Sequence, residues 1–157
     1  MGKWKYVLEH TEMWWSPRMA GATDVALRHR GHLWASITAS GTLTIHRGYA
    51  SDGATCAPDL KSVLPATRVH DVLCQWGDLL AERGRLAPRT ANRLFFEKMA
   101  ADGVHPLIAV VYWLGTAVFR PLFHGLGRWF NGPDPALSID EQPFTGIGPT
   151  NRFLGNR

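Results

Sequence analysis

The chain has 157 residues, of which 45% are hydrophobic and 19% are charged, and this balance excludes an intrinsically disordered protein. Its 2 cysteines are too few for a scaffold held together by disulfide bonds. The formal net charge of +4 is weaker than the concentrated positive charge of most DNA-binding domains, and the length suits a single domain.

The first 47 residues predict a small β element. Residues 1–20 contain no continuous apolar stretch of the kind found in signal peptides. Residues 3–9 alternate as a short strand does, whereas residues 10–30 have no clear period and predict a loop. Residues 31–47 predict a hairpin, because apolar side chains alternate on both sides of a turn at Ser40-Gly41.

Three helical stretches follow a loop at residues 48–58. The first begins near Pro65 and ends at Gly84, and the second runs from Pro88 to about Asp102. The third, residues 107–119, is apolar on every side and continues through a proline kink to about residue 130. The apolar run alone is shorter than the roughly 20 residues that a membrane-spanning helix needs.

These elements predict an α+β fold in which a small antiparallel β-hairpin element packs on a three-helix unit. We expect one domain over residues 1–132. Residues 133–157 are rich in proline and glycine, carry only scattered apolar residues, and cannot build a core of their own. They predict an extended C-terminal arm that docks on neighbouring chains.

The polar residues that could carry chemistry are Asp52, Thr55, His70, Asp71, Cys74 and Asn92. His70 and Cys74 stand one helical turn apart, so their side chains share a face of the first helix. The favoured interpretation is a structural hydrogen-bond network of Asp52, Thr55, His70, Asp71 and Asn92, which fixes how the loop and the helices meet. This interpretation requires no cofactor.

Two chemical alternatives stay open for the same residues. Asp52, His70 and Asp71 are candidate ligands of a divalent metal, because carboxylates and imidazole are common metal ligands. In that case His70 and Asp71 are the candidate catalytic residues of a small metal-dependent hydrolase. Alternatively, Cys74 could act as a nucleophile beside His70, although cysteines inside helices are more often small core residues.

Nucleic acid is not the expected partner. Arg85, Arg89 and Arg93 stand at helical spacing, but nearby acidic residues make this row typical of a solvated helix face. Peripheral contact with a membrane is a further alternative, since residues 107–130 place Arg120, His124 and Arg128 on one polar stripe.

The segments SDGATCAPDL at 51–60, RVHDVL at 68–73 and PRTANRLFFEKM at 88–99 resemble a phage and prophage family known as domain of unknown function 1353. The resemblance covers about residues 45–118. Residues that follow the family pattern in order are Asp52, Gly53, Ala54, Thr55, His70, Asp71, Leu73, Arg89, Ala91 and Phe95. Cys74 replaces the usual tyrosine of the family, and Asn92 replaces an aspartate, which removes a carboxylate from any metal site.

The resemblance implies a virion protein of a tailed phage or prophage, made in the host cytoplasm. We expect a structural or assembly protein, tail-associated, in an oligomeric assembly with other virion proteins. The residues expected to bind these partners are Trp113, Arg120, His124, Arg128, Trp129, Phe144 and Phe153. The alternative is the metal-dependent hydrolase, acting in lysis or on host nucleotides.

Overall fold

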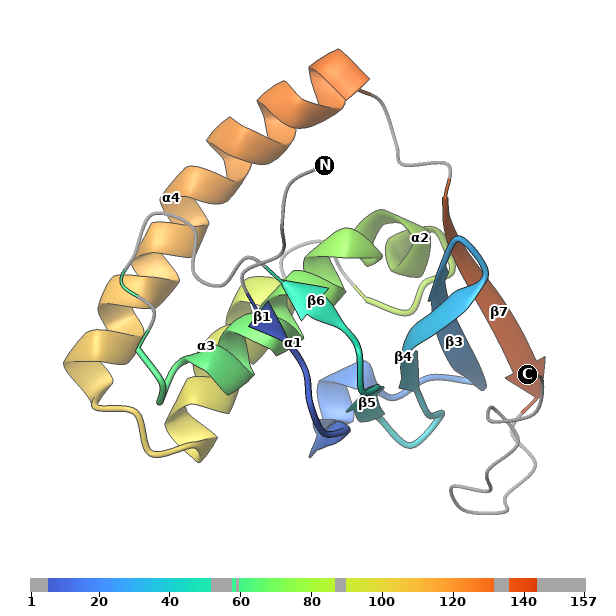
Figure 1. Ribbon diagram of the computed structural model, residues 1–157, viewed down its shortest axis with the longest axis horizontal. Coiled ribbons are helices and arrows are strands. Elements are labelled where there is room, and N and C mark those ends of the chain that lie inside the picture. The colour runs from blue at the N-terminus through green and yellow to red at the C-terminus, as the bar shows by residue number, and fades with distance from the viewer. Residues whose placement is uncertain (1–5, 52–57, 59, 87–89, 132–135, 144–157) are drawn as a thin grey trace.

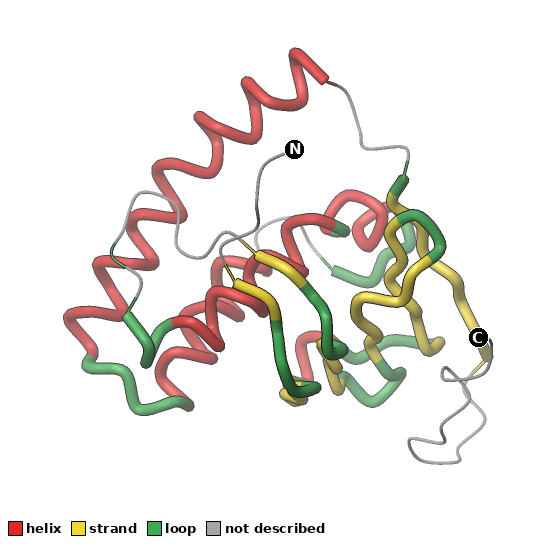
Figure 2. Tube along the Cα trace, in the orientation of Figure 1, coloured by secondary structure: helices red, strands yellow, loops and turns green. Residues whose placement is uncertain are grey.

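Strands and helices form separate layers in the part of the chain that the structure describes, residues 6–51, 58, 60–86, 90–131 and 136–143. In this computed structural model the main sheet lies on one side, α1 and α3 lie in the middle, and α4 lies on the far side (Figure 1). Figure 2 shows the strands of the main sheet gathered on the side away from α4. The predicted α+β class is confirmed.

The main sheet is antiparallel and has the strand order β2-β5-β4-β3-β7. Its strands are β2 (Glu12–Trp15), β3 (Thr23–His29), β4 (His32–Ile37), β5 (Thr42–Ile45) and β7 (Leu137–Pro143). A second, two-stranded sheet pairs β1 (Tyr6–Val7) with β6 (Ala50–Ser51). The predicted hairpin is confirmed as β4 and β5, with Gly41 in its turn at a φ of 93°.

The described residues form four α-helices, which are α1 (Leu64–Gln75), α2 (Gly77–Glu82), α3 (Thr90–Ala101) and α4 (Pro106–Asn131). The first predicted helix is divided at Trp76, which is buried and donates its indole N–H to the Arg28 carbonyl oxygen at 3.2 Å. The third forms a single helix, with Pro121 inside it.

Two hydrophobic cores hold these layers together. The first joins the inner face of the sheet to α1, with Leu27, Ile37 and Leu43 from the strands against Val72 and Trp76. The second lies among the helices, and its members are Val63, Ala66, Phe95, Met99, Val104, Ala109 and Tyr112. Because α1 and α3 each contribute to both cores, these two helices connect the sheet to α4.

The sequence predicts a loop over residues 10–30, but the structure has mostly strands and a short helix there. They hold β2, a short 3₁₀-helix at Pro17–Met19, and β3. Val25, Ala26 and Leu27 are consecutive and all buried, so both faces of β3 are covered there. A strand that is covered on both faces does not show the alternation that a half-buried strand shows.

The predicted C-terminal arm also differs from the structure. Residues 137–143 form β7, which pairs along its whole length with β3, and Ile139 is buried in the first core. The described part of the arm therefore completes the chain's own sheet and belongs to the domain. Residues 144–157, including Phe144 and Phe153, lie outside the described residues.

Candidate functional site

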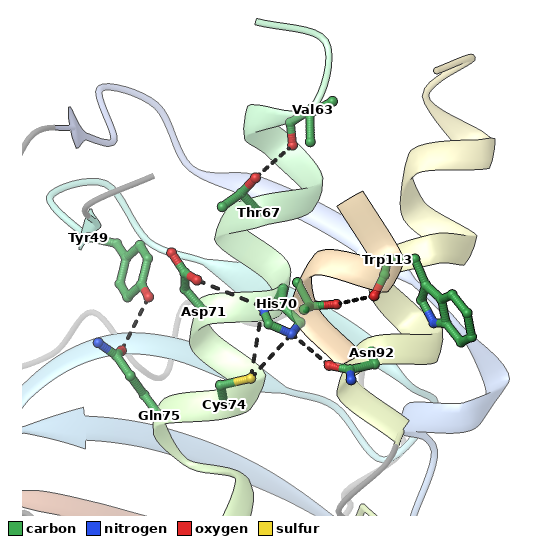
Figure 3. Close-up of polar contacts among 10 residues, drawn as sticks. Tyr49, Val63, Thr67, His70, Asp71, Cys74, Gln75, Asn92 and Trp113 are labelled. Carbon is green, nitrogen blue, oxygen red and sulfur yellow. Dashed lines mark hydrogen bonds and ion pairs between the residues drawn. The ribbon is translucent and has the colours of Figure 1, made fainter. Parts of the chain in front are cut away.

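Helix α1 brings His70 and Cys74 into contact. Pro65 occupies the first turn of α1, and Val69, Val72 and Leu73 are buried. The Cys74 Sγ atom lies 3.5 Å from His70 Nε2 and 3.9 Å from His70 Nδ1. The one-turn spacing thus places a thiol against an imidazole, as Figure 3 shows.

Helix α3 closes the site from the other side. The Asn92 Oδ1 atom lies 2.9 Å from His70 Nε2, and the Phe95 ring centre lies 5.0 Å from that of the imidazole. When Nε2 carries a proton, it donates to the Asn92 oxygen. Asn92 therefore orients the ring, and Phe95 supplies an apolar wall.

Asp71 provides a carboxylate beside the same imidazole. Its Oδ1 atom lies 3.9 Å from His70 Nδ1 (Figure 3). Burial lowers the pKa of His70, but the polar contacts with Asp71, Cys74 and Asn92 outweigh burial and raise that pKa to about 10. The imidazole is therefore a cation at neutral pH, between an amide oxygen, a carboxylate and a sulfur atom.

Tyr49 and Gln75 extend the cluster, and the sequence did not indicate them. The buried Tyr49 hydroxyl donates to Gln75 Oε1 at 3.2 Å. Burial raises the pKa of Tyr49 well above its ordinary value, and electrostatic interactions with the nearby Asp71 and Cys74 raise it further. No spacing rule could find Tyr49, because it lies in the connection between β5 and β6 and reaches α1 only through the tertiary fold.

Three members of the predicted network, His70, Asp71 and Asn92, lie together in the structure, and Cys74 joins them. Asp52 and Thr55 lie outside the described residues. Within the described ranges, no group of three His, Cys, Asp or Glu side chains is placed to hold a metal ion. The metal alternative stays a prediction, and a metal at His70 would have to displace the proton that the raised pKa favours.

The outer surface of α4 is the second candidate site. Leu107, Val111, Leu114 and Val118 are exposed by 72%, 64%, 49% and 57%, and we call these four residues the α4 strip. Trp113 stands beside the strip and is partly exposed. The side chains of Arg120, His124, Arg128 and Trp129 lie outside the described part of the structure.

The arginine row does not form a continuous surface. Arg85 is only 7% exposed, and its Nη2 atom contacts the carbonyl oxygens of Ile37 and Thr38. Arg93 is exposed and pairs with Glu97, while Arg89 lies outside the described residues. A helical face of three arginines is therefore not available to nucleic acid as the spacing suggested.

No protein-family model matches the chain, and neither a curated protein nor a solved structure gives a significant match. Among the described residues, no helix has the length and apolar character needed to cross a membrane.

Proposed function

We propose that this chain is a virion-associated assembly protein of a tailed phage or prophage, and that it docks on a neighbouring virion protein through the α4 strip. The observation that carries the proposal is the exposure of four aliphatic side chains in one row of the helix. The phage origin and the tail association rest on the family resemblance of residues 45–118.

The α4 strip is a continuous apolar row. Its members follow one another at intervals of four, three and four residues, which places them on one face of a helix. The opposite face is already used, because Ala109 and Tyr112 pack in the second core with Phe95 and Met99. Contiguous exposed apolar surface is typical of an interaction site. The fold does not require this apolar surface, since a helix with a polar outer face would pack on the domain equally well.

The partner that best suits this strip is a protein with an apolar groove that accepts its aliphatic side chains. An amphipathic helix that enters such a groove is a common mode of protein recognition. α4 is also tied to the domain on both sides, since it packs on α3 and the chain after it returns as β7. We therefore favour a fixed protein neighbour over a lipid surface.

The test replaces one strip residue by a charged residue and follows incorporation into particles. Leu114→Glu places a carboxylate in the strip, and Met13→Glu makes the same change at a 60% exposed methionine on β2. Purified particles from cells that produce each variant are analysed for bound protein. We expect Leu114→Glu to reduce incorporation at least about tenfold, which corresponds to about 1.4 kcal/mol of docking energy, and Met13→Glu to leave it unchanged.

Two results would overturn the proposal. One is equal incorporation of Leu114→Glu and the wild type, with both proteins folded by circular dichroism. The other is binding of the wild type, but not of Leu114→Glu, to anionic vesicles without any particle association. That result would assign the strip to a lipid surface.

A further inference from the structure

Strand β7 forms one edge of the main sheet. Within the described ranges, β7 pairs with β3 on one side and with no strand on the other, and we call that other side the open edge (Figure 1). The pairing with β3 runs over the 7 residues of β7 without a shift of register. A long and regular edge strand of this kind is a template for pairing with another strand.

The register with β3 determines which backbone groups of β7 face the open edge. Arg30 N–H donates to the Ala136 oxygen at 2.8 Å, and this pair continues the register of β3 and β7 by one residue. Because hydrogen-bonded and non-hydrogen-bonded pairs alternate in an antiparallel ladder, the even-numbered residues of β7 bond to β3. The N–H and C=O groups of Leu137, Ile139 and Glu141 are therefore directed to the open edge.

The two carboxylates of β7 have arginine partners within the chain. Arg28 Nε donates to Asp140 Oδ2 at 2.6 Å, and Glu141 Oε1 lies 2.8 Å from Arg83 Nε. Natural edge strands commonly avoid pairing through a charged side chain, above all a lysine, or through a bulge. β7 contains no lysine, and its pairing with β3 has no bulge. It thus lacks two of the features that commonly prevent edge-to-edge pairing.

We propose that β7 pairs in antiparallel orientation with β7 of a second copy of this chain, with Ile139 opposite its counterpart. Leu137 then lies opposite Glu141 of the second copy, so the three residues that face the open edge all exchange hydrogen bonds. The two-fold axis passes between the two isoleucines, and both subunits use the same surface. This inference goes beyond the docking function, because it concerns a surface other than the α4 strip.

Charge and hydrogen bonding favour this register over its neighbours. A two-fold axis at Asp140 would place two carboxylates directly opposite each other, which is destabilising. An axis at Ser138 would leave Glu141 opposite a position outside β7 and would lose its hydrogen bonds. With the axis at Ile139, each exposed Asp140 faces the exposed hydroxyl of Ser138 from the second copy. The order of residues on β7 is thus self-complementary in one register.

Sedimentation velocity of the full-length protein measures the association. We expect the wild type to form a dimer at about 100 μM. Glu141→Pro removes an N–H from the open edge and is expected to raise the dissociation constant of the dimer at least about tenfold. Glu141→Ala is the matched control, because it removes the same carboxylate and the contact with Arg83 but keeps the N–H. It is expected to change the constant less than about twofold.

Three results would overturn the proposal. The first is a wild type that stays monomeric at this concentration, as it would if residues 144–157 paired with β7 of their own chain. The second is an equal dissociation constant for Glu141→Pro and Glu141→Ala. The third is a dimer that Leu114→Glu dissociates, since that would assign the association to the α4 strip. We expect Leu114→Glu to remain dimeric even where it is lost from particles, so the two proposals fail separately.

A cysteine pair tests the register and does not depend on the folding of a proline variant. Ser138→Cys combined with Asp140→Cys puts thiols opposite each other in a non-hydrogen-bonded pair, where α-carbons are about 4.5 Å apart and a disulfide fits. Under mild oxidation we expect a disulfide-linked dimer above the wild-type level, and at least about fivefold less from Ser138→Cys alone. A double variant that does not cross-link, or equal cross-linking by Ser138→Cys alone, would overturn the proposed pairing.

Discussion

The α-carbon of Gly41 lies so close to the carbonyl oxygen of Ser16 that a Cβ atom on Gly41 would stand 2.4 Å from it. The two residues also share a backbone hydrogen bond, since Ser16 N–H donates to the Gly41 oxygen at 3.1 Å. Gly41 forms the turn between β4 and β5, whereas Ser16 follows β2 and caps the 3₁₀-helix. The contact therefore joins the end of β2 to the central hairpin.

Gly41→Ala is expected to lower the free energy of unfolding by about 2–3 kcal/mol. The positive φ of 93° costs roughly 1–2 kcal/mol for a residue with a Cβ, and the clash with Ser16 adds to that cost. Gly48→Ala is the matched control, because Gly48 has the same φ and nothing within 4 Å of its Cβ position. Urea unfolding measures both variants, and equal losses would show that the Ser16 contact is unimportant.

The pKa of His70, raised from 6.5 to about 10, predicts a pH window for stability. Between these values the folded protein binds a proton that the unfolded protein does not. The free energy of unfolding should therefore fall as the pH rises through the window, by up to about 1.4 kcal/mol per pH unit. Below pH 6.5 both states hold the proton, so this contribution is fully present there.

His70→Gln is the control for this window. It is expected to flatten the fall in urea-unfolding free energy between neutral and alkaline pH. Burial lowers the pKa of His46, so His46 acts at more acidic pH and cannot mimic the effect. An unchanged slope in His70→Gln would show that another group causes the dependence.

Two ion pairs of different exposure should differ in strength. Arg68 on α1 contacts both carboxylate oxygens of Glu12 on β2, and its side chain is 15% exposed. Arg93 and Glu97 are i,i+4 neighbours on α3, and the Arg93 side chain is 63% exposed. We expect a coupling energy of about 1–3 kcal/mol for Arg68 with Glu12 and about 0.3–0.5 kcal/mol for Arg93 with Glu97.

Double-mutant cycles measured by urea unfolding test this difference. Arg68→Met and Glu12→Gln remove the first pair, and Arg93→Ala and Glu97→Gln remove the second. Similar coupling energies in the two cycles would contradict the expectation that the pair between α1 and the sheet carries more stability.

Ile139 should be required for β7 to stay on the sheet. Its side chain is buried in the first core, whereas the neighbouring Ser138 is exposed. Ile139→Ala is expected to cost about 2–4 kcal/mol of unfolding free energy, and Ser138→Ala less than about 0.5 kcal/mol. A loss below about 1 kcal/mol for Ile139→Ala would mean that β7 contributes little to the domain.

The sequence predicts elements whose signals are local. The hairpin alternates visibly and has a glycine at its turn, and α3 ends beside Gly103 at a φ of 72°. β7 escaped prediction because its partner β3 is distant in the sequence, as the pairing of Leu27 with Ile139 illustrates. β3 was missed because its middle residues are all buried.

The sequence likewise predicts only those contacts of the candidate site that arise within one helix. Helical spacing places Cys74 beside His70 without any knowledge of the fold. The approach of Asn92 depends on how α3 packs against α1, although the family resemblance pointed to that position. The charge on the imidazole could not be predicted, because it depends on the balance between burial and three polar neighbours.

The pairing of β7 with β3 has a consequence for the order of folding. The ribosome synthesises β3 early and β7 only after the whole of α4, so the growing chain carries β3 with one row of backbone groups unpaired. Such an open strand edge can pair with other chains, and contacts between distant segments form slowly. The nascent protein is thus most prone to aggregation until β7 emerges. In addition, α4 must form without preventing the return of the chain to the sheet.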